Sequence, residues 1–440
     1  MKKLLSLLAA VGVVFALSSC GDDDDGPAPI GGLAISGIPA NASVTAGETL
    51  TVNNVSLSYE DGFGSFNVVL NGTTTLDLGA LITDPAATSA TGLTITFDTD
   101  ETLIGTNTLV FNLTDADGDA VDFTHTLVVE AIIPTFTVQD ATEQRGPDED
   151  NTVEYPQNEV TGIINTDYTF TNDVVWVLNG RVIVDAGATL TIEAGTIIKG
   201  TTGQGALSSV LLVASRATIN AIGTSDDPIV MTSIEDNINL AGSAYYDQEN
   251  DVIVAGTDPS ADGFTSTLDV DLDIGKWGGL IVLGDAPISA DGATTVIEGI
   301  PSSVAQAVYG GSNAEHNAGV VRYVSIRFSG TQLGPGNELQ GVTLGGVGSG
   351  TEINWVESIA SADDGMEIFG GTVNITNFIV WGQEDDGYDT DQAWTGTVDK
   401  FVYLGTNATA DHAFELDGPE GSAKGVGNFI NGTVWGANSS

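Results

Sequence analysis

The feature that most restricts the fold of this chain is a group of three very short apolar strands that recurs in the same order. "VIV", "LTI" and "IIK" lie within residues 180–200 and are separated by turns that contain Ala-Gly. "LLV", "TIN" and "IVM" lie within residues 209–233, so the second group begins 29 residues after the first (209 − 180). Strands this short cannot bury an apolar face alone, and successive groups must therefore stack. The repeat predicts a parallel β-helix.

Similar short apolar strands separated by turns continue along the chain, and we expect the β-helix to occupy residues 166–440. The later coils start at Gly275, Val320, Leu339, Thr351, Thr372, Thr397 and Asn428. Residues 234–274 interrupt the pattern, and because a coil has no room for them we expect a long loop over one face. The last strand stands close to residue 440 with no capping segment behind it, so we expect the helix to be truncated there.

Residues 33–133 have a different pattern, in which short alternating strands are separated by turns. Strands at this spacing over about 100 residues predict an immunoglobulin-like β-sandwich, which makes the whole chain all-β. The turn "DADGD", residues 115–119, has the Asp-Gly chemistry of a tight hairpin, and its aspartates leave calcium binding open as an alternative. Residues 134–165 break the strand rhythm, and we expect them to form a linker or a cap.

The first residues predict export of the protein. Lys2 and Lys3 precede an apolar run that is too short for a membrane span, so residues 1–19 are interpreted as a signal peptide. The only cysteine, Cys20, follows "LSS", which resembles the lipobox of bacterial lipoproteins, where the cysteine is acylated. We therefore expect a lipid anchor at Cys20 that attaches the protein to the outer membrane. The alternative is an ordinary signal peptide followed by a stray cysteine.

The tether expected at residues 20–32 contains the acidic run "DDDD". Consecutive aspartates repel one another and stay solvated, so this segment will not pack. An acidic run directly behind a lipidated cysteine also resembles the surface-export signal of Bacteroidetes lipoproteins. That resemblance implies a location on the cell surface, and the alternative is a flexible spacer.

The net charge of the chain limits its partners. Sixty acidic residues stand against eleven basic ones, which gives a formal charge of −49. Nucleic acid is excluded as a partner because phosphate binding needs a basic surface. An anionic polysaccharide is repelled unless a cation bridges it, whereas divalent cations are attracted.

An acidic pattern recurs within the predicted β-helix. "DDG" starts at Asp363 and again at Asp385, 22 residues later (385 − 363), and a weaker copy starts at Asp411. If this interval is one coil, equivalent carboxylates stack about 4.8 Å apart and repel one another. Calcium, which binds several carboxylate oxygens, relieves such repulsion by bridging adjacent coils. The residues of this candidate calcium ladder are Asp363, Asp364, Glu367, Asp385, Asp386, Asp389, Asp391, Asp411, Glu415 and Asp417.

Two alternatives to calcium are open at this ladder. Strand alternation points Glu367, Asp389 and Glu415 outward, which also fits a solvated acidic ridge. Catalysis is the other alternative, since a glycoside hydrolase uses a pair of carboxylates and a polysaccharide lyase adds a basic residue. The candidate bases for a lyase are Lys276, Arg327 and Lys400.

Aromatic residues stand beside the acidic pattern. Trp381, Tyr388 and Trp394 are candidates for a platform that binds a neutral glycan. Packing inside the coils is the alternative for each of them.

Several phrases of the sequence carry a family resemblance. "ATLTIEAGTIIKG", "PIVMTS", "WGGLIVLGDAPI", "RYVSIRFSG", "DDGMEIFGGTVN" and "DDGYDTDQAWTG" resemble the right-handed β-helix lipoproteins of Bacteroidetes, over residues 174–440. The resemblance implies the fold and the location but no assigned activity. We therefore expect a non-catalytic module that binds a glycan or an outer-membrane protein, with structural calcium. The alternative is a carbohydrate-active enzyme, either a polysaccharide lyase or a glycoside hydrolase.

Overall fold

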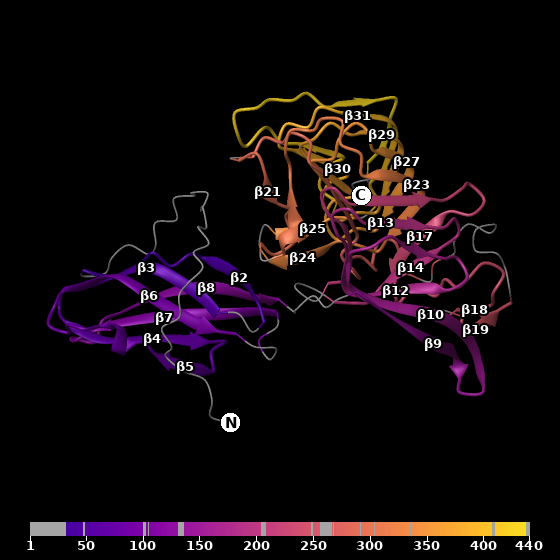
Figure 1. The fold of residues 1–440 in the computed structure, drawn as a ribbon. Helices are drawn as coiled ribbons and strands as arrows, with labels where there is room; N and C mark the ends of the chain where they lie inside the picture. The colour runs from indigo at the N-terminus through magenta and orange to yellow at the C-terminus, as the bar shows by residue number, and fades with distance from the viewer. Residues whose placement is uncertain are drawn as a thin grey trace. The chain divides into compact units, whose positions relative to one another are not determined.

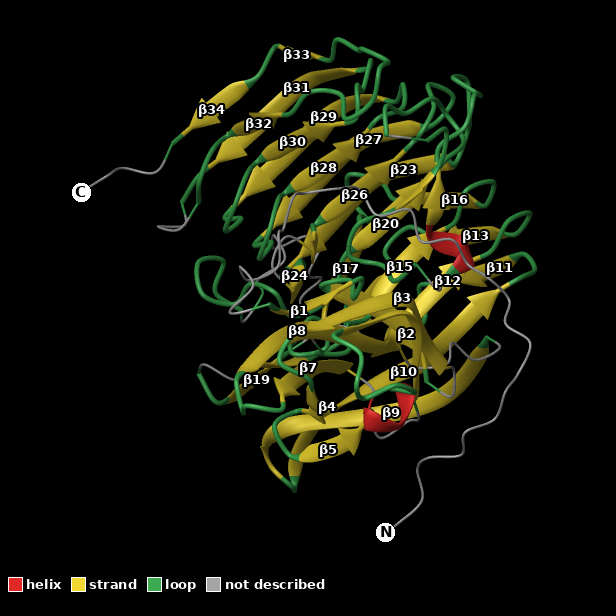
Figure 2. Cartoon of the chain, turned by 90° about the vertical axis from the view of Figure 1, so that its left-hand side faces the viewer, coloured by secondary structure: helices red, strands yellow, loops and turns green. Residues whose placement is uncertain are grey.

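The protein consists of two compact units, residues 1–132 and 133–440 (Figure 1). Strands make up both units, which confirms the all-β class (Figure 2). Within the described residues, no helix combines the length and the apolar character needed to cross a bilayer. The computed structural model describes residues 32–46, 49–99, 103, 105–130, 136–203, 208–247, 250–255, 266, 268–290, 292–302, 304–334, 337–406 and 410–436.

The first unit contains two mainly antiparallel sheets, in the orders β1-β3-β6 and β2-β8-β7-β4-β5. Val52 and Leu57 on β3 share one buried apolar cluster with Leu109 and Phe111 on β7. Two sheets with a common core form the immunoglobulin-like β-sandwich that the strand rhythm predicts. The strands are β1 (Leu33–Ser36), β2 (Asn41–Thr45), β3 (Thr49–Tyr59), β4 (Phe63–Leu70), β5 (Thr74–Asp77), β6 (Ser89–Asp98), β7 (Gly105–Asp115) and β8 (Ala120–Glu130).

The aspartates in the turn between β7 and β8 have a structural role that needs no metal. The Asp115 carboxylate accepts hydrogen bonds from the backbone N–H groups of Asp117, at 3.1 Å, and Asp119, at 2.9 Å. A side chain that binds its own turn in this way stabilises the hairpin. Among the described residues, the three aspartates do not gather their oxygens into a group that could hold an ion.

Residues 134–165, expected as a linker or a cap, contain a long hairpin. β9 (Thr137–Asp148) and β10 (Asn151–Ile164) pair antiparallel, and β10 also pairs in parallel with β12 (Val175–Val184). The parallel pairing begins at Gln157, so the ladder of coils starts before residue 166.

The second unit is a parallel β-helix whose coils contribute strands to three parallel sheets. The first sheet, which carries the site, contains part of β10 and of β12, then β15 (Val210–Val213), β20 (Leu280–Leu283), β26 (Val342–Gly345), β28 (Met366–Phe369), β30 (Tyr388–Asp391) and β32 (Phe414–Leu416). The other two sheets contain β11 (Tyr168–Phe170), β13 (Thr189–Ile192), β14 (Ile197–Gly200), β16 (Thr218–Ile222), β17 (Ile229–Ser233), β23 (Gly319–Arg327), β27 (Glu352–Ile359), β29 (Asn374–Trp381), β31 (Thr397–Leu404), β33 (Asn428–Ile430) and β34 (Thr433–Trp435). Small hairpins in the insertions are formed by β18 (Tyr245–Asp247) with β19 (Val252–Val254), β21 (Thr295–Val296) with β22 (Val308–Tyr309), and β24 (Thr331–Gly334) with β25 (Asn337–Leu339).

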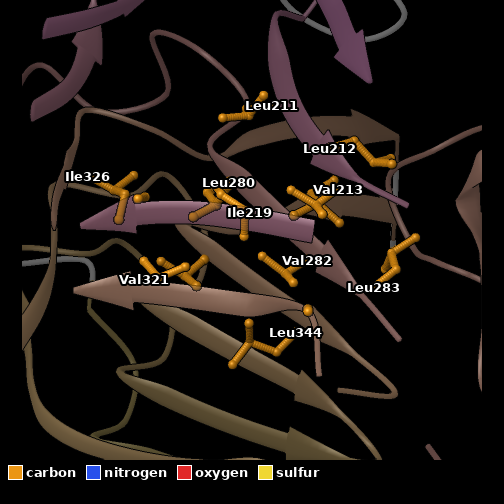
Figure 3. Close-up of a cluster of buried hydrophobic side chains, with 14 of the residues drawn as sticks. Leu211, Leu212, Val213, Ile219, Leu280, Val282, Leu283, Val321, Ile326 and Leu344 are labelled. Carbon is orange, nitrogen blue, oxygen red and sulfur yellow. The ribbon is translucent and has the colours of Figure 1, made fainter. Parts of the chain in front are cut away.

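Apolar side chains stack from coil to coil in the interior of the β-helix. Leu211 on β15 lies in register with Leu280 on β20, and Val213 lies in register with Val282 (Figure 3). All four are fully buried. Each side chain of this kind contributes about 1.5–3 kcal/mol when removed from water, so the stack is the main source of the stability of the coils.

The segment 234–274 was expected to project as a loop, but its beginning is packed against the first coils. Lys199 Nζ donates a hydrogen bond to the backbone oxygen of Asp236 at 2.6 Å, and the Arg145 guanidinium donates to the same oxygen at 3.2 Å. Burial lowers the pKa of Lys199 to about 7. The ring of Tyr155 lies 5.3 Å from the Lys199 ammonium nitrogen, so two strands of the hairpin and one coil hold this segment together.

A second insertion, residues 284–318, covers the outer face of the first sheet and is called the covering insertion here. Its Ile297 and Tyr309 belong to the same buried cluster as the interior of the coils. Alternation points Leu212 and Ile281 of the sheet outward, yet both are fully buried. At these coils the outer face of the sheet is therefore shielded from water.

Candidate functional site

The outer face of the first sheet carries a column of carboxylates. Glu367 on β28 lies in register with Asp389 on β30, which lies in register with Glu415 on β32. Thr343 and Ile281 occupy the same position on the two preceding strands. The outward column therefore changes from apolar through neutral polar to acidic along the stack.

Glu367 and Asp389 are buried, which excludes a solvated ridge at these two positions. Their exposed fractions are 6% and 9%, whereas Glu415 is exposed. Alternation correctly assigns these side chains to the outer face of the sheet. It does not reveal what lies on that face, and here insertions cover part of it.

Contacts of the covering insertion locate it beside Glu367. The ring of Tyr309 lies 6.2 Å from the ring of Phe369, which points to the same face of β28 as Glu367. Ile297 lies over the adjacent strand, because a Cβ placed on Gly345 would come within 3.0 Å of it. Gly345 and Phe369 are partners in register, so both contacts lie at one place on the sheet.

The second aspartate of each "DDG" turn connects one coil to the next. The Asp364 carboxylate accepts a hydrogen bond from the N–H of Asp386 at 3.0 Å, and the Asp386 carboxylate accepts one from the N–H of His412 at 2.6 Å. Asp363 accepts a hydrogen bond from the side-chain amide of Gln340 at 3.3 Å. These contacts hold the turn carboxylates close to the start of each strand in the first sheet.

Three groups of side chains bring one ligand atom from each member within 4.8 Å of one another. The groups are Asp364 with Glu367 and Asp389, Asp363 with Asp364 and Asp385, and Asp386 with Asp411 and His412. The first of these is called the buried group, because all three of its members are buried. Asp364 belongs both to the buried group and to the second group, which is more exposed.

Burial changes the protonation of these carboxyl groups. It raises the pKa of Asp363 to about 8 and the pKa of Asp389 to about 6. It also raises the pKa values of Asp364 and Glu367 well above their usual range, and neighbouring carboxylates add to the effect. A hydrogen bond with Asp386 is the main cause that raises the pKa of Glu415 to about 7. Ionising the buried group is therefore unfavourable unless a positive charge joins it.

One oxygen of the buried group has no hydrogen-bond donor. Asp389 Oδ1 is buried and has no partner among the described residues. A buried carboxylate oxygen without a donor is costly, and carboxylate oxygens are the ligands that calcium takes at about 2.3–2.6 Å. His412 is the one nitrogen ligand in the three groups, so their donor atoms fit calcium better than zinc.

Two acidic residues of the site were missed by sequence reasoning, because they lie in insertions and not in the repeat. Glu298 belongs to the covering insertion and Glu338 to β25, and the N–H of Glu338 donates to the Glu298 carboxylate at 3.3 Å. Burial raises the pKa of Glu298 to about 7, and the charges of Glu338 and Asp389 add to it. The signal that could have located Glu298 is the wide interval from Gly275 to the next coil start (320 − 275 = 45 residues).

The remaining residues of the predicted ladder lie outside the buried group. Asp385, Asp411 and Asp417 are exposed. Asp391 is half-buried, and its carboxylate accepts a hydrogen bond from the N–H of Gln392 at 2.7 Å. Burial raises the pKa of Asp391 to about 6.

The expected aromatic platform is not formed, because two of its three residues are inside the β-helix. Tyr388 is fully buried, and its hydroxyl donates to the backbone oxygens of Phe378 and Val402. Trp394 is also buried and donates to the backbone oxygen of Val373. Trp381 is partly exposed, packs on a separate small apolar cluster and donates to Thr406.

The candidate bases for a lyase form ion pairs with residues outside the acidic column or lie on another sheet. Lys276 pairs with Glu235 at 3.0 Å and with Asp273 at 3.1 Å. Arg327 pairs with Glu357 at 3.3 Å. Lys400 lies on β31, which does not belong to the first sheet.

The anchor predicted at Cys20, together with the signal peptide at residues 1–19 and most of the acidic tether, lies outside the described residues.

Stacked coils joined by three parallel sheets define the class of the second unit, a parallel β-helix. Residues 162–244 and 243–435 match the family described as pectate-lyase-like β-helix domain, and the chain belongs to this family. No curated protein matches the chain.

Proposed function

We propose that this is a lipid-anchored protein of the outer membrane, exposed on the cell surface, whose β-helix binds a glycan or a partner protein without catalysis. Calcium in the acidic column supports the fold of the binding module. The observation that carries the proposal is the buried group of Asp364, Glu367 and Asp389, with an oxygen of Asp389 that has no donor. Carboxylates in this state favour a divalent cation.

The anchoring part of the proposal is supported by sequence alone. Cys20 follows "LSS" and precedes four aspartates, which together resemble the signals of surface lipoproteins. The charge of −49 also makes nucleic acid an unsuitable partner.

The non-catalytic part is supported by the partners of the basic residues. Lys276 and Arg327 form ion pairs with carboxylates that do not belong to the column. A lyase needs a base that can take a proton from the substrate beside the cation, and these ion pairs hold both side chains in their charged form.

The first prediction concerns calcium itself. We expect calcium chloride, titrated into the full chain in a calorimeter, to bind, and the double variant Glu367→Gln/Asp389→Asn to lose at least about tenfold in affinity, because charged ligands are replaced by neutral ones of the same size. The matched control Asp226→Asn/Glu315→Gln removes two exposed charges and should bind like the wild type. A wild type that binds no calcium would remove this part of the proposal.

A carbohydrate-active enzyme is the second candidate, and two observations favour it. The family description names a pectate lyase, and the raised pKa values of Asp389 and Glu298 suit general acids. Incubation of the protein and calcium with neutral and anionic polysaccharides separates the candidates. If the protein is a binding module, we expect it to retain a polysaccharide without forming new polysaccharide chain ends. Release of unsaturated products or of new reducing ends would instead support the enzyme.

A further inference from the structure

One corner of the β-helix carries an exposed pair of aromatic rings. β23 pairs with β16 up to Arg322 and with β17 from Val324, so Tyr323 stands where the strand turns from one sheet into the next. Trp355 occupies the same place on β27, because its two neighbours pair with the two neighbours of Tyr323. The rings of Tyr323 and Trp355 are parallel within 2°, with centroids 5.7 Å apart, and Trp355 is 48% exposed.

The backbone of this corner does not need aromatic side chains. β23, β27, β29 and β31 follow one another along the stack (Figure 2), and each places a residue with positive φ here: 50° at Tyr323, 54° at Trp355, 53° at Asn377 and 59° at Lys400. Asparagine tolerates this left-handed conformation, whereas a bulky ring is disfavoured in it. Two strained aromatics at the surface, at a corner that the next coil builds with Asn377, point to a role in binding.

The indole face of Trp355 that is turned away from Tyr323 is not covered by another ring. The aromatic stack ends at Trp355, because the next coil places Asn377 at this corner. Within the part of the chain that the structure describes, Trp355 stacks on Tyr323 alone. The centroid distance of 5.7 Å also exceeds the contact distance of about 3.5–4.0 Å between carbon atoms, so the two parallel rings overlap only in part. A flat apolar surface is therefore left for a ligand.

Hydrogen-bonding side chains stand directly beside this surface. Asn354 precedes Trp355 and points outward, because Ile353 points into the core. The Asn377 amide donates a hydrogen bond to Asn354 Oδ1 at 2.9 Å, which holds the two side chains together. Among the described residues, Asn377 Oδ1 and Asn354 Nδ2 have no protein partner, so one acceptor and one donor remain for a ligand.

Charges of both signs stand at this corner, in contrast with the chain as a whole. Arg322 pairs with Glu352 at 3.1 Å, and the exposed Lys400 follows Asp399. Arg322 and Lys400 are two of only 11 basic residues in a chain that has 60 acidic ones. A surface on which basic and acidic residues balance is complementary to a neutral ligand.

We infer that this corner binds a neutral glycan, with one sugar ring seated on the open face of Trp355 and its hydroxyl groups bonded to Asn354 and Asn377. The inference rests on the proposed function, because it assigns the class of glycan and the binding surface of the same β-helix. A pyranose ring has a face of C–H groups, which packs on an aromatic ring, and a rim of hydroxyls, which needs donors and acceptors. This corner offers both.

The size of the corner fits a glycan better than a protein partner. A stable protein interface buries about 800 Å² on each side, whereas one open ring between polar side chains matches one or two sugars. Coils rise by about 4.8 Å, which is close to the length of one sugar unit in an extended chain. A glycan that runs along the corner therefore meets one coil for each sugar.

Native electrophoresis of the full chain, through gels that contain laminarin, xyloglucan or galactomannan, tests the inference, because a bound polysaccharide slows the protein. We expect at least one of these neutral polysaccharides to slow the wild type, and Trp355→Asn to lose at least about tenfold in affinity for it. Asparagine suits the backbone at this corner, so Trp355→Asn should unfold at the same urea concentration as the wild type or at a higher one.

Two further variants separate binding from folding. Trp355→Phe keeps an aromatic ring and should retain part of the affinity that Trp355→Asn loses. Trp435→Ala is the matched control, since Trp435 is 62% exposed and lies on β34 outside this corner. We expect Trp435→Ala to be slowed like the wild type.

Three results would overturn the inference, with different consequences for the proposed function. If a neutral polysaccharide slows the wild type and Trp355→Asn equally, the assigned surface is wrong and the proposed glycan binding survives. If only an anionic polysaccharide, with chondroitin sulfate as the probe, slows the wild type, the ligand class is wrong and glycan binding again survives. If none of the four polysaccharides slows the wild type, the inference and the glycan part of the proposed function both fail, which leaves a protein partner.

Discussion

At the scale of single residues, the carboxyl groups of the acidic column link stability to pH. An Asp in an unfolded chain has a pKa of about 3.9, whereas burial raises the pKa of Asp363 to about 8 and that of Asp389 to about 6 in the fold. Between these values the folded protein binds more protons than the unfolded chain. The free energy of unfolding therefore falls as pH rises through this window.

We expect the calcium-free protein to melt at a lower temperature at pH about 8 than at pH about 5. Calcium should raise the melting temperature more at the higher pH, because protons then compete less for the carboxylates. Thermal denaturation in chelator and in calcium at both values measures this. The variant Asp363→Asn/Asp389→Asn should show a weaker pH dependence, and a wild type that is more stable in chelator at the higher pH would contradict the assignment.

The same carboxylates show which features of the site could be predicted from the sequence and which could not. Glu367, Asp389 and Glu415 lie in register because their spacing follows the length of a coil, which is a local property of the chain. The first two are buried in the fold, and the charge of Glu298 in the covering insertion helps to raise the pKa of Glu367. Neither fact could be predicted from the repeating pattern, because the insertion is not part of that pattern.

At the scale of elements, the last coils are joined by aromatic rings inside the β-helix. The Tyr388 ring lies 5.8 Å from the ring of Phe414 on the next coil and 5.4 Å from that of Phe401. Its hydroxyl shares its one proton between two backbone oxygens, at 2.9 and 3.1 Å. Stacked and edge-to-face rings of this kind contribute beyond their buried area.

We expect Tyr388→Ala to lower the free energy of unfolding of the β-helix by about 3–5 kcal/mol, as for other large buried aromatics. Tyr388→Phe should cost about 1–3 kcal/mol, because it keeps the ring but leaves backbone oxygens without their donor. Trp355→Ala is the control, since this ring is 48% exposed and stacks on Tyr323 at the surface. Urea denaturation compares the three variants. A similar small loss for Tyr388→Ala and Trp355→Ala would contradict the packing role.

The strand triplets were predictable because alternation and turn residues act locally. Val182 pairs with Leu211, at the expected interval of 29 residues (211 − 182). Ile197 pairs with Val230, at an interval of 33 (230 − 197), because the turn before β17 is longer. The β9–β10 hairpin was not predicted, since its residues are mostly polar and its pairing with the first coil is a long-range contact.

At the scale of the whole molecule, each unit has its own apolar core, and the 60 acidic residues of the chain far outnumber its 11 basic ones. A net negative charge repels anionic surfaces. Electrostatic attraction to anionic headgroups therefore does not favour attachment to a membrane, and the proposed covalent lipid would supply the affinity instead. Cys20 is the only cysteine that could carry such a lipid through its thiol.

We expect Cys20→Ala to move the protein from the membrane fraction into the soluble fraction when it is expressed with its own first residues. The reason is that a lipid chain adds about 0.8 kcal/mol of membrane affinity for each buried methylene, whereas the described residues include no membrane-spanning helix. Fractionation with detection of the β-helix measures the change, and Ser19→Ala, which keeps the thiol, is the control that should stay in the membrane. Because the substitution precedes the described residues, which begin at residue 32, calcium binding and the melting temperature of the released protein should equal those of the anchored one. A Cys20→Ala protein that remains in the membrane fraction after a high-salt wash would show that another segment provides the attachment.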